Sequence, residues 1–203
     1  MLRRILIWLV LVSLMATAVF AVDSYLTQRA LAEKTVRLHV VANSDREEDQ
    51  AQKLRVRDAV LQAASQRTAG CTTAEEARLA MQDGLPEIKA AAERVLRAEG
   101  STYSVRVSLQ SERFETRRYE TFTLPAGEYP SLRVVIGAGA GHNWWCVVFP
   151  SLCMAATSED LHRAAAAGGF DAGESALVTG GEEEYVLRFK TLEWLQSLFA
   201  LFS

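Results

Sequence analysis

The chain has 203 residues, of which 49% are hydrophobic and 23% are charged, and its formal net charge at pH 7 is −3. This length and composition are typical of one globular domain, and they exclude a disordered chain and a membrane protein with many spans. The slight excess of acid argues against nucleic acid or anionic lipid as a partner.

The N-terminus has the architecture of an export signal. Arg3 and Arg4 precede an apolar run over residues 5–22, which is close to the roughly 20 residues needed to span a bilayer. The small residues around Ala18 and Ala21 resemble cleavage sites. A cleaved signal peptide and an uncleaved anchor therefore both stay open, with membrane contact through residues 5–22 in the second case.

The positive-inside rule leaves the two arginines in the cytoplasm and carries the rest of the chain outside it. Without them the net charge is −5. We assign residues 1–22 to the signal peptide or anchor, residues 23–34 to a linker and residues 35–203 to a single domain.

The domain begins with a predicted strand over residues 35–42, TVRLHVVA, which is rich in β-branched residues. The sequence SDRE that follows matches a capping box, in which the Ser44 hydroxyl accepts from the Glu47 amide and the Glu47 carboxylate accepts from the Ser44 amide. This box predicts a helix with one apolar face. The acidic residues 47–49 lie in its first turn, where the helix dipole favours them.

A second capping box, TAEE, opens another predicted helix at Thr73. Pro86 suits the first turn of a third helix, and Gly100 suits its end. Residues 102–110 then alternate apolar and polar side chains, which indicates a half-buried strand. After a turn at residues 111–113, we expect the segment FETRRYETFTL to return as its hairpin partner.

Two continuous apolar runs, LRVVIG and WWCVVF, are separated by Gly137, Gly139 and Gly141. They predict a central hairpin from Leu132 to Phe149 that is buried on both faces. The β-rich segment after the glycines argues against a phosphate-binding loop, which needs a helix N-terminus at that place.

The small residues after Cys153 predict a short helix and a loop, and the tail predicts a strand at residues 185–190 and an amphipathic helix. We therefore expect an α+β fold, a single domain with a mainly antiparallel sheet and helices packed on one face.

The segment GHNWWCVVFPSLC gathers a histidine, two tryptophans and two cysteines. Pro150 turns the chain between Cys146 and Cys153, so their Cα atoms can approach to the roughly 5.5 Å that a disulfide requires. We predict that these two cysteines pair and that Cys71 stays free, although spacing alone leaves other pairings open.

Two enzymatic interpretations compete with a structural one. Cys146 as nucleophile with His142 as base is compatible with strand spacing, but an apolar environment raises the pKa of a thiol and reduces its reactivity. A zinc hydrolase would use His39, His142 and His162 with a carboxylate such as Asp45, yet no two of these histidines have the spacing of a helical zinc motif. An exported cell-wall hydrolase, dependent on zinc or on Cys and His, is the alternative function.

Three segments together resemble a known family. RLHVVANSDREEDQAQKLRVRDAVL, FETRRYE and RVVIGAGAGHNWWCVVFPSLC are similar, in this order, to stage II sporulation protein R of endospore-forming bacteria, and the tail RFKTLEWLQ fits as well. The chain departs from the family pattern at Ala138, where an acidic residue is expected, and at Ser151, where proline is expected.

The resemblance implies signalling without catalysis, metal or cofactor. Proteins of this kind are exported by the forespore into the space that faces the mother cell. There they are needed for a membrane-embedded aspartic protease, stage II sporulation protein GA, to process the precursor of sigma factor E. The implied partner is therefore this protease of the sporulation septum, and the implied location is the space between the two membranes.

The segment GHNWWCVVFPSLC contains the predicted contact surface. His142 and Asn143 stand at its loop end, and aromatic side chains dominate binding hot spots when they are exposed. Because neighbouring strand residues point to opposite faces, only one of Trp144 and Trp145 is expected to be displayed. We predict His142, Asn143, Trp144 and Trp145 as partner-binding residues, with no catalytic residue.

Overall fold

The structure is a computed structural model and describes residues 1–155 and 157–179. The tail strand and helix expected from the sequence lie outside the described residues. The elements, in chain order, are α1 (Leu2–Glu33), β1 (Val36–Val41), α2 (Glu47–Thr68), α3 (Ala74–Asp83), α4 (Leu85–Ala98), β2 (Val105–Phe114), β3 (Arg117–Arg118), β4 (Thr123–Leu124), β5 (Gly127–Ile136), β6 (Asn143–Phe149), the 3-10 helix η1 (Leu152–Met154), α5 (Ser158–Ala167) and α6 (Ala172–Thr179).

The main sheet has the strand order β2-β5-β1-β6, with β1 and β5 parallel and the other two pairs antiparallel. This confirms the α+β class, with a main sheet that is mixed and mainly antiparallel. The expected central hairpin from Leu132 to Phe149 is wrong, because β1 lies between β5 and β6. β1 is buried along its whole length. Its position between β5 and β6 gives hydrogen-bond partners to the backbone groups on both of its edges.

The partner expected for the strand at residues 102–110 is also wrong. β2 continues through the expected turn at residues 111–113 and pairs with β5 in an unbroken register, from Val105 opposite Ile136 to Phe114 opposite Gly127. The segment FETRRYETFTL instead folds on itself as the small hairpin of β3 and β4.

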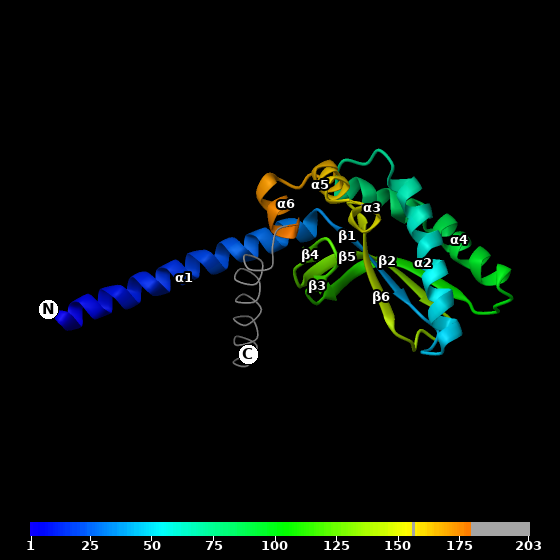
Figure 1. Cartoon of the computed structure of the whole chain (residues 1–203), viewed down its shortest axis with the longest axis horizontal. Helices are drawn as coiled ribbons and strands as arrows, with labels where there is room; N and C mark the ends of the chain where they lie inside the picture. Colours follow the sequence, from blue (N-terminus) through cyan, green and yellow to red (C-terminus); the bar gives the residue numbers. More distant parts are fainter. Residues whose placement is uncertain (156, 180–203) are drawn as a thin grey trace.

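Helices α2, α3 and α4 cover one face of the sheet (Figure 1). Their buried side chains share one core cluster with the strands, including Val56, Met81, Ile88 and Leu38. The opposite face is partly covered by the end of α1, the β3–β4 hairpin and α6, around a second cluster that includes Leu31, Leu124 and Val147.

Helix α1 is long and apolar enough to cross a membrane, and its apolar side chains over residues 5–20 are exposed. Its last turns pack against the domain, where Ser24, Gln28 and Leu31 are buried. The Gln28 side chain donates a hydrogen bond to the carbonyl of Ala126. Residues 23–33, assigned to a linker from the sequence, are thus the docked end of a helix that projects from the domain (Figure 1).

One of the two predicted capping boxes marks the start of its helix, and the other does not. Thr73 accepts from the Glu76 amide as predicted, and Gly100 ends α4 with φ of +71°. The box at Ser44 does not form: α2 begins at Glu47 after Arg46 as N-cap, and the Ser44 hydroxyl donates to the Asp49 carboxylate instead. A buried carboxylate that needs donors takes precedence over the cap.

Candidate interaction site

The loop between β5 and β6 is fastened over the end of β1. The amides of Ala140 and Gly141 donate to the carbonyls of Asn43 and Ala42 at 3.1 Å. The Ala138 amide donates to Oδ1 of Asn43 at 2.9 Å. A Cβ on Gly141 would meet the backbone carbonyl of Ser44, so glycine at this position allows the close approach of the two backbones.

Asp49 is the buried anchor of this loop. Its carboxylate accepts from Nδ2 of the Asn43 side chain at 2.9 Å, from the Ser44 hydroxyl at 2.5 Å and from the Arg46 guanidinium at 3.4 Å. Burial raises the pKa of Asp49, but these hydrogen bonds outweigh it and lower the pKa to about 2. The acid run of α2 therefore includes a structural carboxylate, which the sequence analysis attributed to the helix dipole alone.

His142 is held at its backbone while its side chain faces solvent. Its amide donates to Oδ1 of Asp45 at 2.6 Å, and its ring Nδ1 hydrogen-bonds the same oxygen. Its carbonyl accepts from the buried Lys53 ammonium at 3.0 Å. The two hydrogen bonds from His142 lower the pKa of Asp45, and burial lowers the pKa of Lys53. The His142 side chain is still 80% exposed.

The tryptophans point to opposite faces of the sheet. Trp144 is 37% exposed on the α2 side, with the Arg57 guanidinium 4.4 Å from its ring centroid. Trp145 is half-buried on the other side and stacks on His39 with ring centroids 3.8 Å apart. Trp144 is thus displayed and Trp145 is a packing residue, while Asn143 beside them is exposed.

His39 belongs to a partly buried polar group with Glu112 and Arg133. Its Nδ1 lies 3.2 Å from Glu112, which also pairs with Arg133 at 3.2 Å. These side chains come from β1, β2 and β5, and Trp145 covers the histidine ring. No local sequence signal links them, because their proximity depends on the strand order.

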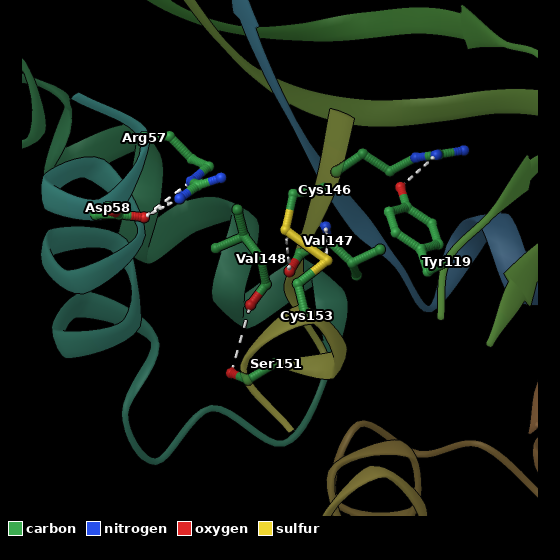
Figure 2. The surroundings of a disulfide bond; sticks show 9 residues. Arg57, Asp58, Tyr119, Cys146, Val147, Val148, Ser151 and Cys153 are labelled. Carbon is green, nitrogen blue, oxygen red and sulfur yellow. Dashed lines mark hydrogen bonds and ion pairs between the residues drawn. A yellow bond between two sulfur atoms is a disulfide. The ribbon is translucent and has the colours of Figure 1, made fainter. Parts of the chain in front are cut away.

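Cys146 and Cys153 lie at disulfide-bonding distance, with Cα atoms 6.2 Å apart (Figure 2). The Val147 amide donates to Sγ of Cys153 at 3.1 Å. Cys71 is a free, half-buried thiol. The geometry is that of the predicted pair, and bond formation in the protein itself stays a prediction.

The described residues do not have the geometry that either enzymatic alternative requires. His39 is buried on β1, His142 lies in the exposed loop, and His162 on α5 contacts Thr179. Within residues 1–155 and 157–179, no three His, Cys, Asp or Glu side chains are grouped to hold a metal ion. Cys146 is buried beside Cys153, so the structure does not pair it with His142 as a nucleophile.

The fold and the site define a class of protein: an α+β domain that follows an apolar N-terminal helix, with a polar loop held by hydrogen bonds at one end of an edge strand. Sequence comparison places the chain in a family. The stage II sporulation protein R family matches residues 32–159, and the chain belongs to this family, which gives it a role in sporulation.

A named relative agrees with the family match. Over 123 residues the chain is 40% identical to the stage II sporulation protein R of Bacillus subtilis (strain 168), which covers 61% of this chain and 55% of the relative. The chain thus matches about half the length of that relative. No solved structure matches this chain.

Proposed function

We propose that this chain is an exported signalling protein of endospore formation. In this proposal it leaves the forespore, stays secreted or anchored by α1 in the space facing the mother cell, and activates the membrane-embedded aspartic protease, stage II sporulation protein GA. The protease then processes the sigma-E precursor. The chain itself catalyses nothing and needs no cofactor.

The observation that carries the proposal is the form of the loop ahead of β6. Asp45 and Lys53 fix the backbone of His142, while the side chains of His142, Asn143 and Trp144 stay exposed. A rigid backbone that presents exposed side chains loses little entropy on binding. Family membership supports the sporulation context, and α1 is compatible with export.

Activation requires that the ligand bind the active state of the protease better than the inactive state. A hundredfold preference would change the ratio of the two states by the same factor, which corresponds to about 2.7 kcal/mol. An exposed aromatic side chain and two polar neighbours are sufficient for such a difference, since single hot-spot residues contribute about 2 kcal/mol or more.

The test reconstitutes the pathway in a bacterium that does not sporulate. The full chain, the protease and the sigma-E precursor are coexpressed, and cleavage of the precursor is followed by immunoblot. Cleavage should require all three proteins. Equal cleavage without the chain, or cleavage by the chain without the protease, would contradict the proposal.

The hydrolase alternative has its own readout. Purified chain should not turn over cell wall or peptide substrates, and chelators should not change signalling. Zinc that co-purifies in a one-to-one ratio, together with loss of both metal and hydrolysis in His142→Ala, would establish the enzyme instead.

A further inference from the structure

The outer edge of β6 is open in the part of the chain that the structure describes. β6 pairs with β1, and no strand within residues 1–155 and 157–179 pairs with its other side. The Val147 amide points away from β1, because it donates to Sγ of Cys153. Alternate residues of an antiparallel ladder turn to the same side. The N–H and C=O groups of Trp145 and Asn143 therefore also face outward.

A groove of about 730 Å³ lies along this edge. Both Trp144 and Trp145 line it, although they point to opposite faces of the sheet, so the groove opens onto the edge itself. One wall is α2, with Arg57, Asp58 and Leu61, and the other is the turn over residues 119–122. Figure 2 shows Arg57 and Asp58 on one side of the cysteine pair and Tyr119 on the other.

The cysteine pair limits the length of the open edge. Cys153 occupies the outward amide of Val147, and η1 follows directly at that end. At the other end, His142 is bonded to Asp45 and Lys53. The open segment is thus Asn143 to Trp145, with its backbone already in the extended form that pairing requires.

Among the described residues, the groove offers one unpaired carboxylate to a basic occupant, and Arg117 lies beside it over the Trp145 ring, 5.7 Å from the centroid. Its lining has one guanidinium, Arg57, and two carboxylates, Asp58 and Glu120. Arg57 lies over Trp144 and is bonded to Asp58, which leaves the exposed Glu120 on the opposite wall without a cation in the lining. Leu61 and Met154 add apolar surface to the lining.

We propose that the β6 edge binds an extended peptide strand of a protein partner, one that carries apolar side chains and at least one lysine or arginine. Only an extended backbone satisfies the outward groups of Asn143 and Trp145 together, and in strand addition these main-chain bonds supply affinity while side-chain contacts supply specificity. The inference rests on the proposed function solely for the partner's identity, which would be an extracytoplasmic segment of the protease.

The test uses three acetylated octapeptides that alternate valine with lysine, with serine or with glutamate, added to the full chain. Amide hydrogen exchange reports protection at Asn143 and Trp145. The lysine peptide should slow exchange at both amides and bind at least threefold more tightly than the glutamate peptide. N-methylation of alternate amides on one edge of the lysine peptide should abolish binding, whereas N-methylation on the other edge should leave it.

Side-chain variants separate edge pairing from simple charge attraction. Glu120→Gln should remove most of the preference for lysine over glutamate and leave thermal stability unchanged, whereas Glu159→Gln on α5, equally a surface carboxylate, should change neither. If no peptide protects Trp145, or if both N-methylated forms bind equally, the proposal is wrong.

Two other occupants are distinguishable. If only a chain truncated after Thr179 binds the peptides, the chain's own C-terminal residues cover the edge, which overturns a partner strand. If the same amides become protected as the chain concentration rises and sedimentation shows a dimer, a second copy is the occupant. Peptide binding without activation of the protease would refute the proposed function and not the edge site.

Discussion

His142 and Asp45 are 97 positions apart in the chain, yet the backbone amide and the ring Nδ1 of His142 both bond the same carboxylate oxygen of Asp45. The contact ties the β5–β6 loop to the segment after β1. One oxygen thereby fixes the direction in which the His142 ring projects, so the loop is ordered in the free chain.

Asp45→Asn should therefore weaken signalling more than it weakens the fold. The variant loses the charged acceptor, but the carboxylate is 55% exposed and little is buried with it. We expect a several-fold decrease in precursor cleavage and a change in melting temperature of less than about 2 °C. Cleavage at the wild-type level would show that the orientation of His142 is irrelevant.

His142→Ala and Asn143→Ala test the contact itself. Exposed loop side chains usually change stability by less than about 0.5 kcal/mol, so both variants should fold, and precursor cleavage should fall at least tenfold if either is a hot spot. His162→Ala is the matched control, because His162 is an exposed histidine on α5, away from the loop. Equal losses in all three variants would indicate a general defect instead of a contact.

The tryptophans should separate stability from recognition. Trp145→Ala removes a ring that stacks on His39 and meets Phe114 edge-on at 4.9 Å, and comparable truncations cost about 3 kcal/mol or more. Trp144→Ala should lower the free energy of unfolding by less, because Trp144 is more exposed. Relative to that loss of stability, it should decrease precursor cleavage more than Trp145→Ala does. Urea denaturation and the cleavage assay measure the two effects side by side.

How far the sequence predicts this fold depends on whether a signal is local. Thr73 and Gly100 mark helix ends correctly, because a cap involves residues within one turn. The predicted strand order is wrong, because the apolar pattern of β5 and β6 is the same whether they pair with each other or with β1. Arg37 and His39 add to the difficulty: both are buried, and Arg37 is covered by the ring of Phe114 from a distant strand.

The candidate site depends on local and non-local signals in the same way. The segment from His142 to Cys153 stood out by composition, and the opposite orientations of Trp144 and Trp145 follow from strand geometry alone. The contacts that hold this segment could not be predicted. Asp49 and Lys53 have the pattern of ordinary charged residues on a helix, and their contacts with Asn43, Ser44 and His142 appear only in the folded chain.

Asp49 gives the fold a dependence on pH. Its pKa is about 2 in the folded chain, against 3.8 for the ordinary group. A depressed folded-state pKa stabilises the protein above pH 3.8, and this contribution is lost as the pH falls toward 2. Denaturation at pH 7, 4 and 2.5 should show the loss, and Asp49→Asn should be less stable at pH 7 with a smaller decrease over this interval. Glu48→Gln, an exposed neighbour, should follow the wild type.

The cysteine pair should be oxidised when the chain is exported as proposed. Mass spectrometry after non-reducing digestion should find Cys146 linked to Cys153 and Cys71 free. A link that closes so short a loop stabilises by roughly 2 to 3 kcal/mol, so the double variant Cys146→Ser, Cys153→Ser should unfold at lower urea concentration, while Cys71→Ser should not. A reduced Cys146 that alkylates at the rate of an activated thiolate would instead support the nucleophile hypothesis.

Gly141 tests the close approach of the loop to the end of β1. A Cβ at Gly141 would meet the backbone carbonyl of Ser44, whereas a Cβ at Gly100 would meet nothing within 4 Å and would be disfavoured only by its φ of +71°. Gly100→Ala should therefore cost about 1 to 2 kcal/mol, and Gly141→Ala should cost more and also reduce precursor cleavage, because the loop must lift and His142 moves with it. Cleavage that falls only in proportion to the folded fraction would mean that the position of the loop does not matter to the partner, and the contact surface would then have to be sought elsewhere on the domain.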